Sequence, residues 1–144
     1  MTRLDYFKVK PDFITKMRQL TREQETFTLD GKLRALIELR VSQINGCDYC
    51  MGLHTREAIA LGEKDQRLEQ LPTWNDSPLF DDRERAALGW AETLTLIPQT
   101  NHADENEYVN LLSMFSETEV VELSLAISLS NFWNRMAGAF RKNH

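Results

Sequence analysis

The sequence has few of the features that mark specialised protein classes. Only two of its 144 residues are cysteines, three positions apart, which excludes the disulfide framework that staples small secreted domains. No apolar stretch approaches the roughly 20 residues that a membrane-spanning helix needs. The first ten residues, MTRLDYFKVK, are too polar and too mixed in charge for a signal-peptide core. We therefore expect a cytoplasmic protein without a membrane partner.

Runs of basic residues are also missing. The formal net charge is -5, and lysines and arginines do not cluster, which argues against a nucleic-acid partner or a polybasic membrane patch. The content of 42% hydrophobic and 27% charged residues is ordinary for a globular protein. A chain of this length buries roughly 68–70% of its unfolded surface without staples. We expect one domain spanning residues 1–144.

The apolar pattern is that of helices throughout, and no segment alternates as a strand would. We therefore predict an all-α fold, a compact bundle of about six to seven helices. One buried stripe is expected on the first helix: Phe13, Ile14, Met17 and Leu20. Four sequence signals mark helix ends. Pro11, Asp30 and the Ser116–Glu119 capping box indicate helix starts, and Asn45-Gly46 indicates where a helix stops. The expected helices span residues 11–27, 31–44, 47–61, 64–71, 82–96, 105–115 and 116–140, with a loop over 72–78 and a break near Asn131.

Two segments of the chain resemble one another. Aligning IELRVSQINGCDYC with VELSLAISLSNFWN places Glu38 on Glu122, and Cys47 and Cys50 on Asn131 and Asn134. This match predicts a degenerate internal helical repeat in which one copy kept the thiols. Chance similarity between two amphipathic helices is the alternative.

The two cysteines belong to a CxxCxxxH motif, NGCDYCMGLH, at a predicted helix start. Free backbone N–H groups and the helix dipole favour a thiolate there, which lowers a cysteine's pKa. Cys50 and His54 are four residues apart and share a helix face, so the imidazole is positioned to take the thiol proton. Cys47 is close enough to form a disulfide with an oxidised Cys50. Glu38, on the preceding helix, is a candidate for relaying protons or orienting His54.

The motif resembles the alkylhydroperoxidase D and carboxymuconolactone decarboxylase family. The resemblance rests on ELRVSQINGCDYCMGLH and extends through SPLFDDRERAALGWAETLT and NFWNRMAGAFR. It implies an alkylhydroperoxidase D-like all-α fold, a homo-oligomer built from dimers (a trimer or hexamer), and a peroxidase without metal or organic cofactor. The partners implied are a hydroperoxide and a thiol or lipoyl-type electron donor.

By the family's motif, Cys50 is the peroxidatic thiol, Cys47 the resolving thiol and His54 the relay base. The best-studied branch has histidine where this chain has Tyr49. Its relay glutamate lies where this chain has Ala35, one helical turn before Glu38. Glu38 is therefore the candidate substitute.

Two other functions are compatible with the sequence. Cys47, Cys50 and His54 would form a metal-binding module, although a fourth ligand is not evident. A binding or scaffold protein of the same fold would use its apolar helix faces for assembly. Both groups of residues also have a purely structural interpretation. The two thiols would then be buried and unreactive, and Glu38 would pair with Arg34 or Arg40.

Overall fold

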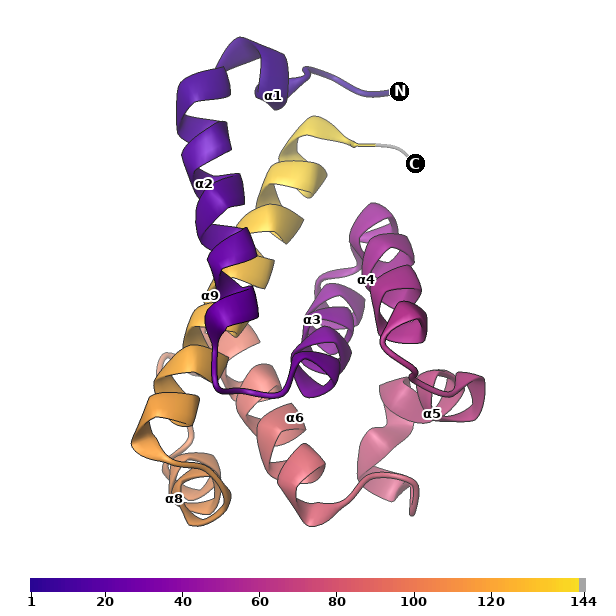
Figure 1. Ribbon diagram of the computed structural model, residues 1–144, viewed down its shortest axis with the longest axis vertical. Coiled ribbons are helices and arrows are strands. Elements are labelled where there is room, and N and C mark those ends of the chain that lie inside the picture. Colours follow the sequence, from indigo (N-terminus) through magenta and orange to yellow (C-terminus); the bar gives the residue numbers. More distant parts are fainter. Residues whose placement is uncertain (143–144) are drawn as a thin grey trace.

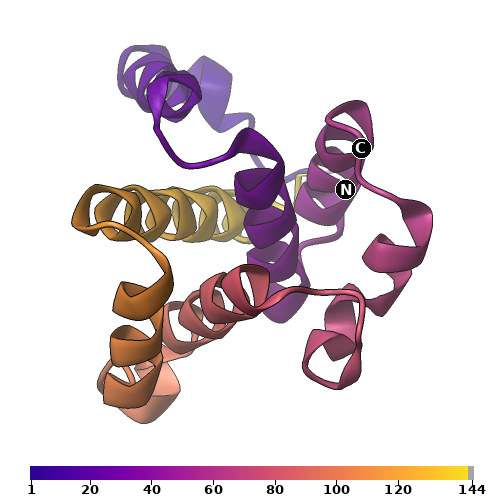
Figure 2. The ribbon, with the colours of Figure 1, turned by 60° about the horizontal axis from the view of Figure 1, so that its bottom comes forward.

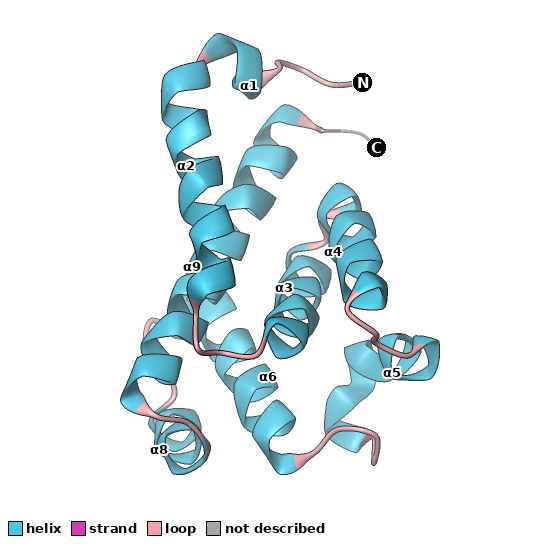
Figure 3. Ribbon diagram, in the orientation of Figure 1, coloured by secondary structure: helices cyan, strands magenta, loops and turns pink. Residues whose placement is uncertain are grey.

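The computed structural model describes residues 1–142, and within this range all regular structure is helical, which confirms the all-α prediction (Figure 3). Nine α-helices and two 3₁₀ turns occur in the described chain, more than expected because two four-residue helices, α1 and α7, were not predicted. The helices are α1 (Tyr6–Val9), α2 (Pro11–Glu23), α3 (Gly31–Asn45), α4 (Asp48–Ala60), α5 (Asp65–Gln70), α6 (Asp82–Thr95), α7 (Ile97–Thr100), α8 (Glu105–Met114) and α9 (Glu117–Phe140).

The end signals in the sequence act as predicted. Asp30 caps α3 by accepting a hydrogen bond from the backbone N–H of Leu33 at 2.9 Å. At the other end of α3, Gly46 adopts φ +64°, a left-handed conformation that glycine takes without a steric penalty. Ser116 and Glu119 form the expected capping box at the start of α9. The short Gly46–Cys47 connection then sets α4 directly against α3.

Three boundaries differ from the prediction. The break expected near Asn131 is wrong, because α9 continues to Phe140. The Asn131 side-chain amide donates to the carbonyl of Ile127 at 3.0 Å and to Thr95 Oγ1 of α6 at 3.2 Å. Its hydrogen bonds are therefore made while the α9 backbone stays helical. The first predicted helix ends at Glu23 and continues only as a 3₁₀ turn to Thr26. Most of the predicted loop over 72–78 lies in a second, kinked 3₁₀ turn, Leu71–Asp76.

Helix α3 lies at the centre of the bundle, where it contacts α4, α6 and α9 (Figures 1 and 2). The largest side chains in this core are completely buried, and they come mainly from these helices: Leu36, Ile37, Leu88, Leu123 and Ile127. Burial of each such side chain contributes about 1.5–3 kcal/mol relative to exposure. The core therefore fixes α3 relative to α6 and α9, while α4 packs against α3, and the CxxCxxxH motif begins at the junction of α3 and α4.

The N-terminal helices cover the C-terminal half of α9. The Trp133 indole N–H donates to Thr21 Oγ1 at 2.8 Å, and the rings of Phe7 and Trp133 stack with centroids 6.2 Å apart. The predicted buried stripe on α2 is only partly correct, because Ile14 is buried whereas Phe13 and Leu20 are 56% and 49% exposed. Helix α2 thus contacts the bundle along a narrower face than its apolar pattern predicts.

Across residues 1–142, none of the helices combines the length and apolar character needed to span a membrane.

Candidate functional site

The two cysteines lie at the start of α4, as predicted, and are joined in a disulfide with their Cα atoms 5.2 Å apart. Cys47 is the N-cap residue, and its sulfur accepts the backbone N–H of Cys50 at 3.3 Å. Such a donor at a helix N-terminus favours negative charge on the sulfur. The two cysteines at the start of α4 are therefore close enough in this fold to be joined as a disulfide.

Cys50 lines a cavity of about 1020 Å³, whereas Cys47 is not among its lining residues. His54 and Glu38 also line the cavity, together with aromatic side chains that include Tyr49 and Trp133. It lies between the N-terminal helices, α3, α4 and α9. Its size is at the upper end of the range for small-molecule sites, so a ligand considerably larger than water fits beside Cys50.

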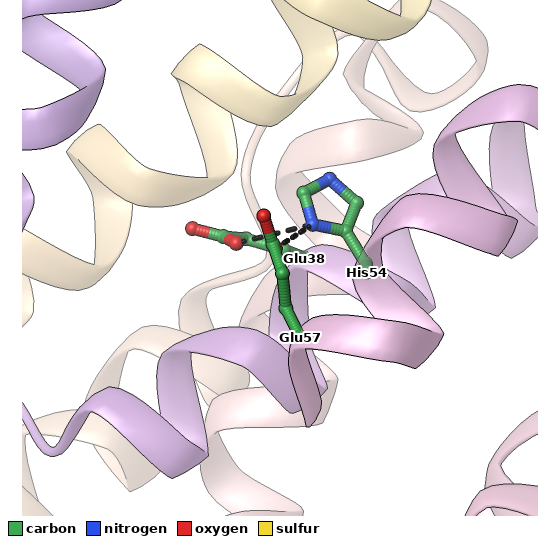
Figure 4. Close-up of side chains that lie close together, drawn as sticks. All are labelled: Glu38, His54 and Glu57. Carbon is green, nitrogen blue, oxygen red and sulfur yellow. Dashed lines mark hydrogen bonds and ion pairs between the residues drawn. The ribbon is translucent and has the colours of Figure 1, made fainter. Parts of the chain in front are cut away.

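His54 is directed toward two glutamates, as Figure 4 shows. Its Nδ1 lies 2.8 Å from Glu57 Oε2 and 3.3 Å from Glu38 Oε2. The imidazole is largely buried, with 12% of the side chain exposed. Ionised carboxylates are only acceptors, so in the neutral imidazole this arrangement favours the proton on Nδ1 and leaves Nε2 as the basic nitrogen.

Glu38 is buried, with 8% of the residue exposed, and reaches His54 from α3. Its Oε1 lies 3.4 Å from Arg34 Nε, one helical turn earlier. Burial raises the pKa of the Glu38 carboxyl and Glu57 adds to the rise, while the positive charges of His54 and Arg34 act in the opposite direction. A carboxyl whose pKa is raised in this way is better suited than an ordinary glutamate to share a proton with an imidazole.

The sequence interpretation missed Glu57 as a member of this cluster. Its signal was present, because Glu57 is three residues after His54 on the same helix face. It was overlooked because an exposed helical glutamate is common. Arg34 was considered only as a surface partner of Glu38, whereas the structure buries most of its side chain in the same cavity wall.

One group in the described chain has ligand atoms close enough to hold a metal ion. The donor atoms of Glu38, His54 and Glu57 all lie within 4.8 Å of one another. This set differs from the metal module considered for the sequence, since both cysteine sulfurs are bonded to each other and His54 points to carboxylates. Two carboxylates and one imidazole are donors that a divalent cation accepts.

Three asparagines, one at the end of α3 and two on α9, connect these two helices. Asn45 donates from Nδ2 to the side-chain oxygens of both Asn131 and Asn134, each at 2.9 Å. Asn134 donates in turn to Ser42 Oγ at 3.2 Å. The positions aligned with the cysteines in the predicted repeat thus form a buried polar network, whereas the repeat itself stays a prediction.

Comparison with known proteins shows the family of this chain. The sequence profile of the carboxymuconolactone decarboxylase family matches residues 11–93. The uncharacterised protein YdfG of Bacillus subtilis is 34% identical over 135 residues, which cover 94% of this chain and 91% of YdfG. The uncharacterised YnjA of Escherichia coli is 29% identical, over 81% of this chain and 63% of its own length.

Two solved structures have the same fold. ATU0492 of Agrobacterium tumefaciens, a protein of unknown function suggested to be an antioxidant defence protein AhpD, superposes with a TM-score of 0.96 at 34% identity. That match covers 100% of this chain and 98% of ATU0492. The debrominase Bmp8 superposes with a TM-score of 0.86 at 22% identity, over 95% of this chain and 73% of Bmp8, and so supports the fold alone. The chain belongs to the carboxymuconolactone decarboxylase family and has the alkylhydroperoxidase D-like fold.

Proposed function

We propose that the protein is a thiol-dependent peroxidase that reduces organic hydroperoxides through Cys50 and Cys47. The Cys50 thiolate attacks the terminal oxygen of the hydroperoxide, so that a sulfur–oxygen bond forms and the oxygen–oxygen bond breaks. Sulfur loses two electrons, and the leaving alkoxide takes a proton to become the alcohol. The Cys47 thiol then attacks the Cys50 sulfenic acid, which forms the disulfide and releases water.

One observation carries the proposal: the reactive pair and a proton-accepting cluster meet at one cavity. Cys50, His54 and Glu38 all line it, although they come from two helices. A structural disulfide would need neither a cavity nor an adjacent imidazole, and a loop this short stabilises a fold little. The suggested antioxidant role of ATU0492, similar over its whole length, agrees with this proposal.

His54 is the general base of the proposed reaction. Its Nδ1 is occupied by the two glutamates, so Nε2 accepts the Cys50 proton, directly or through one water, and returns it to the alkoxide. Glu38 stabilises the imidazolium that forms in between. A positioned base of this kind contributes roughly 10²- to 10⁴-fold to the rate.

The cycle closes with an external thiol donor. Thiol–disulfide exchange transfers two electrons from the donor to the Cys47–Cys50 disulfide and regenerates both thiols. We propose a small thiol or a lipoyl-type dithiol as donor, and a cytoplasmic location, where such donors remain reduced.

We also propose that the protein is a homo-oligomer. Large apolar side chains are exposed on several helices, including Phe13 on α2, Val109 on α8, and Val121 and Leu125 on α9, each between 47% and 59% exposed. Such side chains favour association when they gather on one face.

The experiment is a steady-state assay of cumene hydroperoxide reduction with dihydrolipoamide as donor. Cys50→Ser should abolish turnover. Ser128→Ala, a change on the exposed surface of α9, should leave it unchanged. Full turnover by Cys50→Ser, or none by the wild-type protein with any dithiol, would refute the proposal.

A further inference from the structure

The Glu57 side chain is the closest polar partner of His54, yet it lies outside the CxxCxxxH motif. The separation of 2.8 Å between Glu57 Oε2 and His54 Nδ1 is that of a strong, charge-assisted hydrogen bond. Glu38 Oε2, at 3.3 Å, makes the longer contact with the same nitrogen. The imidazole therefore has two carboxylates competing for one Nδ1 proton, and the geometry favours Glu57.

The two carboxylates differ in their surroundings. The Glu57 side chain is 46% exposed, whereas that of Glu38 is 11% exposed. Burial raises the pKa of the Glu38 carboxyl and so disfavours its ionised form. Glu38 is also drawn toward Arg34, whose Nε lies 3.4 Å from the other Glu38 oxygen. Glu57 is thus the nearer acceptor for the imidazole proton, whereas Glu38 divides its two oxygens between His54 and Arg34.

We infer that Glu57 is a positioning residue that holds the proton of neutral His54 on Nδ1, so that Nε2 remains the base available to Cys50. In Figure 4, Nε2 points away from both carboxylates. Without Glu57 the ring keeps only the longer Glu38 contact, so the Nε2–H tautomer, which cannot accept a proton from Cys50 through Nε2, gains population. This inference deepens the proposed function, because it assigns the group that sets the basicity of the site.

The inference is tested by ¹⁵N NMR of His54 and by the pH dependence of Cys50 alkylation with iodoacetamide. Both are measured on reduced protein in the Cys47→Ser background, which prevents the disulfide. Glu57→Ala should shift the imidazole toward a tautomer mixture and raise the pH midpoint of alkylation by about one unit, equivalent to a tenfold change in proton affinity. Glu57→Gln keeps an acceptor oxygen and should restore the Nδ1–H tautomer.

Glu69→Ala removes an exposed carboxylate on α5 and is the matched control, with no expected change in either readout. An unchanged tautomer and alkylation midpoint in Glu57→Ala would overturn the inference, since Glu38 alone would then suffice. The inference would also be overturned if the wild-type protein bound one equivalent of a metal ion that Glu57→Ala released, because Glu57 would then be a metal ligand.

Neither readout uses peroxide, so each of the two proposals can be refuted independently of the other. If both readouts change as expected while wild-type protein turns over no hydroperoxide, the peroxidase proposal fails and the role of Glu57 stands. If turnover is normal and neither readout responds, only the role of Glu57 is refuted.

Discussion

Replacing Glu38 with glutamine should make the protein more stable and less active. The folded-state pKa of Glu38 lies above its ordinary value of 4.5, because burial outweighs the attraction of His54 and Arg34. The folded state therefore retains a proton over a pH range in which the unfolded state has released it. The contribution of Glu38 to the free energy of unfolding is therefore largest below about pH 4.5, falls as the pH rises to the folded-state pKa, and is level above it.

Glutamine resembles the neutral acid, so Glu38→Gln should abolish this loss. The stability advantage of the variant should appear above pH 4.5 and reach about 1.4 kcal/mol for each pKa unit of the rise. Hydroperoxide turnover should fall on the order of tenfold, since His54 loses one of its anionic partners and with it part of the contribution of the base.

The assay is urea unfolding followed by circular dichroism between pH 4 and 9, together with steady-state turnover. Glu122→Gln is the matched control, because Glu122 is a second buried glutamate at the repeat-related position. It accepts backbone N–H groups from Thr28 at 3.1 Å and Leu29 at 2.8 Å, so its amide variant leaves a donor unpaired and should lose about 1–3 kcal/mol. A Glu38→Gln protein that is less stable than wild type, by a margin that grows with pH, would refute the reasoning.

Three further predictions follow from the site and the surface. Cys47→Ser should stop turnover yet still consume one equivalent of hydroperoxide, with the Cys50 sulfenic acid trapped as a dimedone adduct in mass spectra, because no thiol resolves it; catalytic turnover in this variant would contradict the resolving role. Removal of divalent cations with a chelator should leave turnover unchanged, and a loss restored by zinc would show that Glu38, His54 and Glu57 bind a functional metal. Light scattering should give a mass at least twice the 16.7 kDa of one chain, and a monomer at micromolar concentration would contradict the proposed assembly.

Much of the fold was predictable because its helix ends are local signals. Asp30, Gly46 and the Ser116–Glu119 capping box determine boundaries through contacts within a few residues, so the sequence alone identifies them. The wrong break at Asn131 has the opposite cause. A mid-helix asparagine favours a break by itself, whereas here Thr95 of α6 and the Ile127 carbonyl satisfy its amide. A tertiary partner of this kind is not visible in the sequence.

The site was predictable to a similar extent. The motif spacing made Cys47, Cys50 and His54 candidates, and Glu38 was a candidate as a residue of the preceding helix, one turn after Ala35; the structure brings Glu38 into contact with His54. The missing members, Glu57 and Arg34, follow the same three- and four-residue spacing but belong to no motif. Charged residues at such spacing usually form solvated pairs, so only the burial of Glu38 and His54 distinguishes this cluster.

The central claim is that Cys50, rather than Cys47, is the thiol that attacks the peroxide. The structure distinguishes the two cysteines, because Cys50 lines the cavity whereas the Cys47 sulfur accepts the backbone N–H of Cys50 at the start of α4. The most direct measurement is rapid mixing of reduced wild-type protein with one equivalent of cumene hydroperoxide in the presence of dimedone, followed by peptide mass spectrometry. The account predicts a dimedone adduct on Cys50 that gives way to the Cys47–Cys50 disulfide, and an adduct on Cys47 alone would contradict it.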